Sequence, residues 1–162
     1  MGNGVYFWKI TKYDPNLKTD EWTAMSDVGK VYNGKIFELK EYLRVENLYL
    51  HAIQLIARHN GVSFFEISSL ELLRRPDTPL LDVVDHSSVD LESALVIAQK
   101  VLREELWCKL LHPKMIVHFG YDYYMYIGSA KSSTLELEKI RDMGLFIEEK
   151  KSPYFSDEDV KI

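Results

Sequence analysis

The sequence contains a single cysteine, Cys108, among 162 residues. One thiol excludes an internal disulfide framework and is typical of a protein in a reducing compartment, so we expect a cytoplasmic location. No run of about 18 apolar residues is present, and the expectation is that nothing spans a membrane. The first residues, MGNGVYFWKITKYDP, lack the basic flank and apolar stretch of a signal peptide.

Motifs that carry chemistry are also missing. No Gly-x-Gly-x-x-Gly or Walker loop is present to hold phosphates. Cys108 and His112 have the spacing of two metal ligands, but no second Cys or His pair completes a site, and His51 and His59 point too far apart on one helix. We expect Cys108, which follows Trp107, to be a buried small hydrophobic residue rather than a nucleophile. The sequence therefore predicts no catalytic residue, no metal site and no cofactor.

Basic residues are absent from one long stretch. The net charge is −5, and residues 76–99 contain no Lys or Arg although they contain five carboxylates. This balance disfavours unspecific binding to a phosphate backbone. If these carboxylates face a basic surface on another protein, they would steer its association with this chain. The alternative interpretation is that residues 76–99 include a solvated loop whose charges have no partner. The five are Asp77, Asp82, Asp85, Asp90 and Glu92.

Aromatic residues, by contrast, are concentrated in residues 118–128, which read HFGYDYYMYIG. Side chains alternate along a strand, so Tyr124 and Tyr126 face one way while Tyr123, Met125 and Ile127 face the other. We expect the second set to pack against the second long helix, on its stripe of Leu95, Ala98 and Leu102. The first set is then either covered by the N-terminal loop or open to a partner.

An exposed aromatic strand also suggests the stacking surface of an RNA-binding protein. Such surfaces need Lys or Arg side chains for the phosphates. No basic residue lies between Lys114 and Lys131, and the charge within the strand is that of Asp122. We therefore predict no binding to nucleic acid.

Hydrophobic periodicity predicts an α+β protein in which helices pack on a mixed or antiparallel sheet of about five strands. The order is β-α-β-α-β-β-α-β, with two long amphipathic helices and one short helix. The predicted strands are residues 5–11, 62–68, 114–119, 123–128 and 145–150; the predicted helices are residues 39–60, 89–111 and 133–144.

The chain is expected to form one domain, residues 1–162, because no linker or repeat interrupts it. Its core should span about residues 5–150, and the polar, acidic residues 151–162 should form a frayed tail. Trp22 lies alone in a polar loop, which is typical of a lid folded over the core, with a partner anchor as the alternative.

Three stretches, DEWTAMSDVGK (20–30), LREELWCKL (102–110) and HFGYDYYMYIG (118–128), resemble small bacterial proteins of the polymorphic-toxin immunity type. The resemblance covers most of the chain and implies a small, acidic, cytosolic protein without enzymatic activity that blocks a toxin domain. These stretches contain no motif with a known chemical role, so the resemblance does not identify any functional residue in this chain.

Together these observations favour a non-enzymatic protein that binds a partner with a basic surface, such as a toxin or nuclease domain that it inhibits. We expect a monomer or a weak homodimer. The alternatives are a module that binds a small molecule in a tyrosine-lined pocket and a small enzyme with a buried titratable pair. The predicted partner-binding residues are Trp22, Asp77, Asp82, Asp85, Tyr121, Asp122, Tyr124 and Tyr126.

Overall fold

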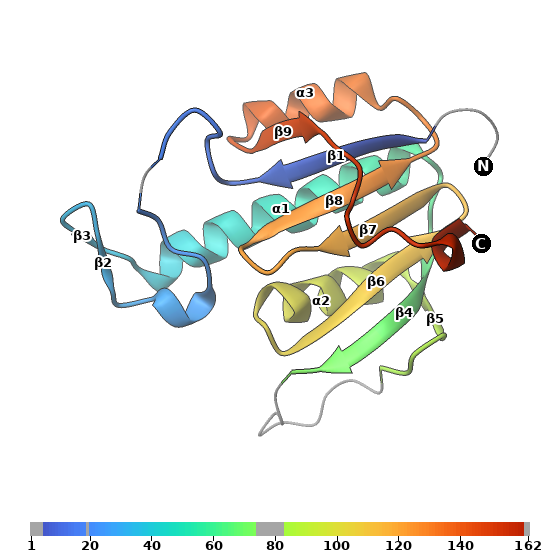
Figure 1. Ribbon diagram of the computed structural model, residues 1–162, viewed down its shortest axis with the longest axis horizontal. Coiled ribbons are helices and arrows are strands. Elements are labelled where there is room, and N and C mark those ends of the chain that lie inside the picture. Colours follow the sequence, from blue (N-terminus) through green and yellow to red (C-terminus); the bar gives the residue numbers. More distant parts are fainter. Residues whose placement is uncertain (1–4, 19, 74–82, 161–162) are drawn as a thin grey trace.

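The computed structural model describes residues 5–18, 20–73 and 83–160. Within these residues, seven strands form one antiparallel sheet in the order β5-β4-β6-β7-β8-β1-β9 (Figure 1). The strands are β1 (Tyr6–Thr11), β4 (Phe64–Leu72), β5 (Ser88–Asp90), β6 (Leu106–His112), β7 (Met115–Phe119), β8 (Tyr124–Ser129) and β9 (Phe146–Glu149).

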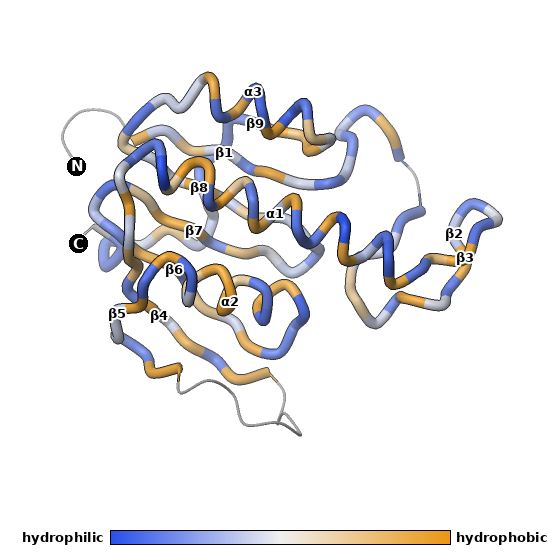
Figure 2. The backbone as a smooth tube through the Cα atoms, turned by 180° about the vertical axis from the view of Figure 1, so that it is seen from behind, coloured by the Kyte–Doolittle hydropathy of each residue, from blue (hydrophilic) through white to orange (hydrophobic). Residues whose placement is uncertain are grey.

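Three helices cover one face of this sheet, as the views from both sides show (Figures 1 and 2). They are α1 (Leu39–His59), α2 (Leu91–Leu102) and α3 (Thr134–Asp142). A small hairpin, β2 (Val31–Tyr32) and β3 (Lys35–Ile36), projects beside the start of α1. Its turn is Asn33-Gly34, where both residues have positive φ, as a two-residue hairpin turn requires. The α+β class is confirmed, while the sheet has more strands than we expected.

The first long helix follows its predicted bounds closely. Its apolar stripe includes Tyr49, Ile53 and Ile56, all fully buried against the sheet. The helix ends at His59, two residues before Gly61, whose φ of +68° is easily adopted by glycine, and the Val62 N–H then donates to the Ala57 carbonyl. Short-range signals therefore determine this element.

The prediction of one helix over residues 89–111 is wrong. The helix α2 ends at Leu102, and Glu104 then adopts a φ of +60°, which turns the chain into strand β6. Residues 102–105 favour a helix, so this boundary is not evident in the sequence. The side chains that follow nevertheless alternate as in a strand, because Leu106 and Cys108 face the core while Trp107 faces away. Pairing of β6 with both β4 and β7 overrides the local preference.

The hairpin of β7 and β8 has the predicted faces. Met125 and Ile127 are fully buried and Tyr123 is 3% exposed in the hydrophobic core beneath the helices. Tyr123 packs edge-on against Tyr42 and Tyr49, so its main partner is α1. We had expected α2 to cover these residues, but α2 lies chiefly over β6 and β4.

The C-terminal segment, which we define as residues 150–160, differs from the frayed tail that the sequence suggested. It crosses the sheet face opposite the helices and ends in a short 3-10 helix, Asp157–Val160 (Figure 1). Ser152 and Asp159 are 5% and 3% exposed. The polar composition of the segment suggested a frayed tail. The segment is ordered because its polar groups find partners in the sheet beneath it.

Candidate functional site

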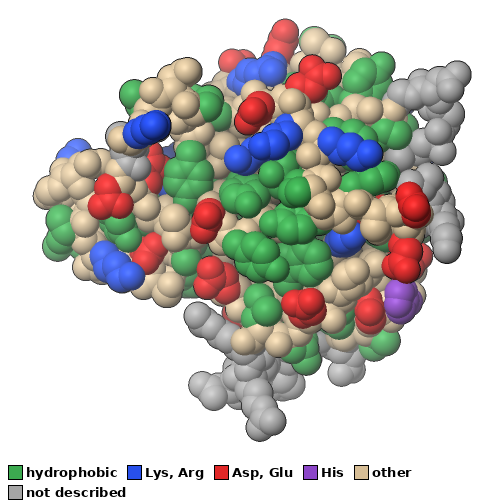
Figure 3. Space-filling model, viewed as in Figure 1, with side chains coloured by type: hydrophobic (Ala, Val, Ile, Leu, Met, Phe, Trp, Pro, Cys, Tyr) green, Lys and Arg blue, Asp and Glu red, His purple; other side chains and the backbone are tan. Residues whose placement is uncertain are grey.

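Five aromatic side chains gather on the sheet face that the helices leave open. We call Trp107, Tyr121, Tyr124, Tyr126 and Tyr154 the tyrosine patch. They come from β6, the turn between β7 and β8, strand β8 and the C-terminal segment. Figure 3 shows hydrophobic side chains at the centre of this face and acidic side chains along its lower border. A contiguous aromatic patch of this kind is characteristic of an interaction surface.

Tyr154 connects the patch. Its ring centroid lies 5.9 Å from that of Trp107 and 6.3 Å from those of Tyr121 and Tyr126, all with edge-to-face geometry. Tyr124 adds a perpendicular contact to Tyr126 at 5.7 Å. Such contacts hold the rings in defined positions, and a pre-ordered aromatic surface loses little entropy on binding.

The exposure of the rings varies across the patch. Tyr121 is 67% exposed, Tyr126 is 4% exposed and forms the base, and the other rings are half-buried. The Lys9 ammonium lies 4.6 Å from the centre of the Tyr124 ring. Burial raises the pKa of the Tyr154 hydroxyl to about 12, so this ring is neutral near pH 7. The patch therefore presents uncharged aromatic surface with hydroxyl groups for hydrogen bonds.

A buried polar cluster fastens the C-terminal segment beside the patch. The Lys109 ammonium lies 3.2 Å from Asp159 Oδ2 and donates to the Tyr154 carbonyl at 2.6 Å. His118 lies under the same segment, with Nδ1 2.6 Å from the Ser152 hydroxyl and Nε2 3.3 Å from Asp159 Oδ2. The second contact is not aligned as a hydrogen bond. These contacts fix Tyr154 over the sheet.

Ser152, His118 and Asp159 are the residue types of a serine-hydrolase triad, but their surroundings indicate a structural role. They are 5%, 0% and 3% exposed, so a substrate has no path to the hydroxyl. The Ser152 hydroxyl also accepts the Tyr154 N–H at 3.1 Å. Asp159 is paired with Lys109, which stabilises the carboxylate and leaves it less able to support an imidazolium.

The structure separates the predicted partner-binding residues into groups. Tyr121, Tyr124 and Tyr126 meet in the patch, and the exposed Asp122 lies next to Tyr121 in the same turn. Asp77 and Asp82 lie outside the described residues. Asp85 is half-exposed at the junction of β4 and β5, where it accepts the backbone N–H groups of Leu70 and His86.

Trp22 is a core residue and does not offer its ring to a partner. It is 8% exposed and stacks on Phe37 at 4.4 Å, with further contacts to Tyr42 and Tyr123. The Lys12 ammonium lies 4.1 Å from the centre of its ring. This placement matches the lid interpretation and not that of a partner anchor.

Sequence reasoning missed Trp107 and Tyr154. Trp107 was assigned to a helix and Tyr154 to a frayed tail, so neither was considered for the open sheet face. The alternation of Leu106, Trp107, Cys108 and Lys109 was an available signal for a strand with one polar face. No local signal placed Tyr154, because its position depends on contacts with distant strands.

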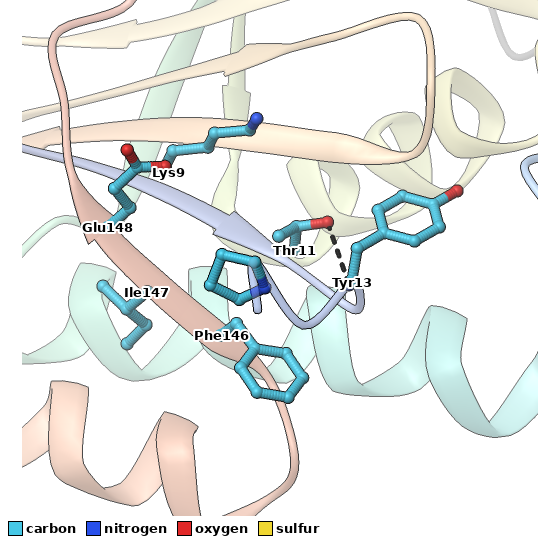
Figure 4. A pocket seen from close by; sticks show the side chains of 7 residues that line it. Lys9, Thr11, Tyr13, Phe146, Ile147 and Glu148 are labelled. Atoms are coloured by element: carbon cyan, nitrogen blue, oxygen red, sulfur yellow. Dashed lines mark hydrogen bonds between the residues drawn. The ribbon is translucent and has the colours of Figure 1, made fainter. Parts of the chain in front are cut away.

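The described residues also form several clefts, with volumes from about 20 to about 330 Å³. A cleft of about 120 Å³ lies over the paired strands β1 and β9, lined by Lys9, Thr11, Phe146 and Glu148 (Figure 4). A larger cleft of about 330 Å³ lies at the edge of the tyrosine patch, beside Trp107 and Tyr121. Within the parts of the chain that are described, no group of three or more His, Cys, Asp or Glu side chains is arranged to hold a metal ion. None of the described helices has the length and apolar character needed to cross a membrane.

Comparisons of the chain with protein-family models, with curated proteins and with solved structures found no match. The function is therefore argued from the site itself.

Proposed function

We propose that the chain is a protein-binding protein that docks through the tyrosine patch. The observation that carries this proposal is the set of aromatic rings, joined through Tyr154, on the sheet face opposite the helices. Tyrosine and tryptophan contribute most to binding at protein interfaces, because they bury a large area and still offer a polar group.

The size and shape of the site favour a protein partner over a small molecule. The two clefts that Tyr121 lines have volumes of about 20 and 330 Å³, and the larger is only at the lower end of ligand pockets, which run from roughly 300 to 1,000 Å³. A sheet face with one strongly exposed ring, Tyr121, suits a second protein surface better than it suits an enclosed ligand.

The charge of the chain favours a basic partner. The net charge is −5, and exposed carboxylates accompany the patch in the turn at Asp122 and in the C-terminal segment at Asp157 and Glu158. Charges at the rim of an interface act mainly on the association rate. An inhibitor or immunity protein that blocks a basic toxin domain would combine these two properties.

The test is binding kinetics by surface plasmon resonance against the product of the neighbouring gene. Tyr121→Ala and Tyr124→Ala should each raise the dissociation rate by roughly tenfold or more, because each removes an aromatic anchor. Asp122→Asn should slow association at low salt and have little effect at high salt. Tyr6→Ala is the matched control, because Tyr6 is a half-exposed strand tyrosine on the helix-covered side of the sheet.

Equal effects of Tyr6→Ala and Tyr121→Ala would contradict the tyrosine patch as the docking surface. Absence of binding to any neighbouring gene product would contradict the assignment as an inhibitor.

A further inference from the structure

The cleft at the edge of the tyrosine patch is lined by the kinds of residue that bind an organic cation. Its volume is about 330 Å³, and it lies between the end of α2, the start of β6 and the turn between β7 and β8. Two aromatic residues of the patch form part of its wall, and one carboxylate lines it. The lining residues are Leu73, Val101, Glu104, Trp107, Gly120 and Tyr121.

Glu104 is the carboxylate in this cleft, and it has no counter-ion among the described residues. The charged residues on either side of it in the sequence are both paired: Glu105 with Lys100 at 3.0 Å, and Arg103 with Glu46 at 2.8 Å. Glu104 is half-buried, so its charge is partly shielded from water. An unpaired, half-buried carboxylate is stabilised when a cation binds beside it.

The backbone holds Glu104 in an unfavourable conformation. Its φ is +60°, in the left-handed region that residues with a side chain rarely adopt. Tyr123, at the end of the facing turn, has a φ of +58°. Strained positions are retained where surrounding structure fixes them, and they are common at binding sites. Glu104 therefore has a defined backbone conformation in the wall of a cleft that Trp107 and Tyr121 also line.

We infer that this cleft receives an arginine side chain of the protein partner. The inference rests on the proposed function and adds the chemistry of the contact. A guanidinium group can stack on the faces of Trp107 and Tyr121 while it pairs with the Glu104 carboxylate through two N–H donors. A lysine ammonium is a compact, strongly hydrated charge that gains less from the aromatic wall. Arginine is also enriched at interface hot spots.

The direct test uses N-acetyl-L-arginine amide as the probe and follows the indole N–H signal of Trp107 by NMR. The dissociation constant should be on the order of millimolar, as befits a ligand of this size. The lysine amide should bind about threefold more weakly. The citrulline amide, which has the same shape without the charge, should bind at least about tenfold more weakly.

Two isosteric variants locate the probe. Glu104→Gln should weaken arginine amide binding by about five- to tenfold, because it removes the charge and keeps the shape and backbone. Glu105→Gln is the matched control, since it removes the neighbouring carboxylate that already pairs with Lys100, and it should change binding by less than about twofold. Equal effects of the two variants, or equal binding of the citrulline amide, would overturn the inference.

Two further outcomes would also overturn it. Tighter binding of tetramethylammonium than of the arginine amide would assign the cleft to a small quaternary cation instead. Arg74 and Arg75 follow Leu73 in the sequence and lie outside the described residues. Tighter probe binding after Arg74→Ala and Arg75→Ala would show that the chain's own arginine competes for the cleft.

Partner kinetics separate this inference from the proposed function. If partner binding depends on Tyr121 and Tyr124 but is unchanged in Glu104→Gln, the arginine contact is wrong and the docking surface stands. If the arginine amide binds at Glu104 but no partner binds the tyrosine patch, the proposed function fails and the cation site stands.

Discussion

The hydroxyl group of Ser152 lies 2.6 Å from Nδ1 of His118, which connects the C-terminal segment to the central strand β7. His118 is completely buried, and Lys109 and Asp159 lie beside it. Burial of these groups costs desolvation energy, so the cluster is favourable only while all partners are present. The position of Tyr154, and with it the tyrosine patch, depends on this cluster.

The ion pair between Lys109 and Asp159 gives the first prediction. Asp159→Ala should lower the free energy of unfolding by about 3–5 kcal/mol, because it leaves the buried ammonium without its carboxylate. The double variant Lys109→Met with Asp159→Ala should lose clearly less, because no unpaired charge remains. Urea unfolding measures both values. Equal losses in the single and double variants would show that the pair does not contribute as described.

The second prediction concerns the pH dependence of stability. Burial lowers the pKa of His118 to about 4, opposed by Asp159 and assisted by Lys109, whereas an unfolded histidine titrates near 6.5. Between these values the unfolded chain binds more protons than the folded one. The contribution of neutral His118 is therefore complete above about pH 6.5 and is lost as the pH falls towards 4, on the order of 3 kcal/mol in total.

Unfolding of wild type and His118→Gln across pH 4–7 tests this dependence. The wild type should become less stable as the pH falls, and the variant should show a shallower slope over the same range. His51→Gln, which replaces an exposed histidine of α1, should keep the wild-type slope. An unchanged slope in His118→Gln would assign the acid sensitivity to other groups.

The third prediction concerns the thiol of Cys108. Its side chain is fully buried in β6, and burial, with a smaller effect of Asp85, raises the pKa of the thiol to about 12. The native protein should therefore react with a thiol reagent only when it unfolds. Cys108→Ala should lower the free energy of unfolding by roughly 1–2 kcal/mol through the lost packing. Rapid labelling of the native protein would contradict the placement of this residue.

The fourth prediction concerns the hydroxyl group of Tyr49. It donates to the Tyr123 carbonyl at 2.6 Å and accepts a hydrogen bond from the Lys12 N–H at 2.8 Å. The hydroxyl group therefore joins α1 to the residue that follows β1 and to the residue that precedes β8. Tyr49→Phe should lower the free energy of unfolding by about 1–3 kcal/mol, because two backbone groups lose their partner. Tyr6→Phe, at a half-exposed tyrosine, should change it by less than about 0.5 kcal/mol in a parallel thermal or urea measurement.

Short-range patterns in the sequence predicted much of the scaffold. The stripe of α1 and its stop at Gly61, the end of α3 before Gly144 and the alternating faces of β8 all follow from side-chain periodicity and from glycine conformations. The same alternation predicted that Tyr124 and Tyr126 face away from the helices, but it left open whether that face is covered. These features need only the nearest turns of the chain.

Only the tertiary structure shows that Trp107 and Tyr154 belong to the tyrosine patch. Residues 102–105 favour a helix locally, and only pairing with β4 and β7 makes the following residues a strand that presents Trp107. The C-terminal segment is mostly polar, and its polar contacts are with Lys109 and His118, which lie in strands far away along the chain. Contacts between distant residues bring Tyr154 to the centre of the patch, because the energy that holds it comes from groups that meet only after the sheet has formed.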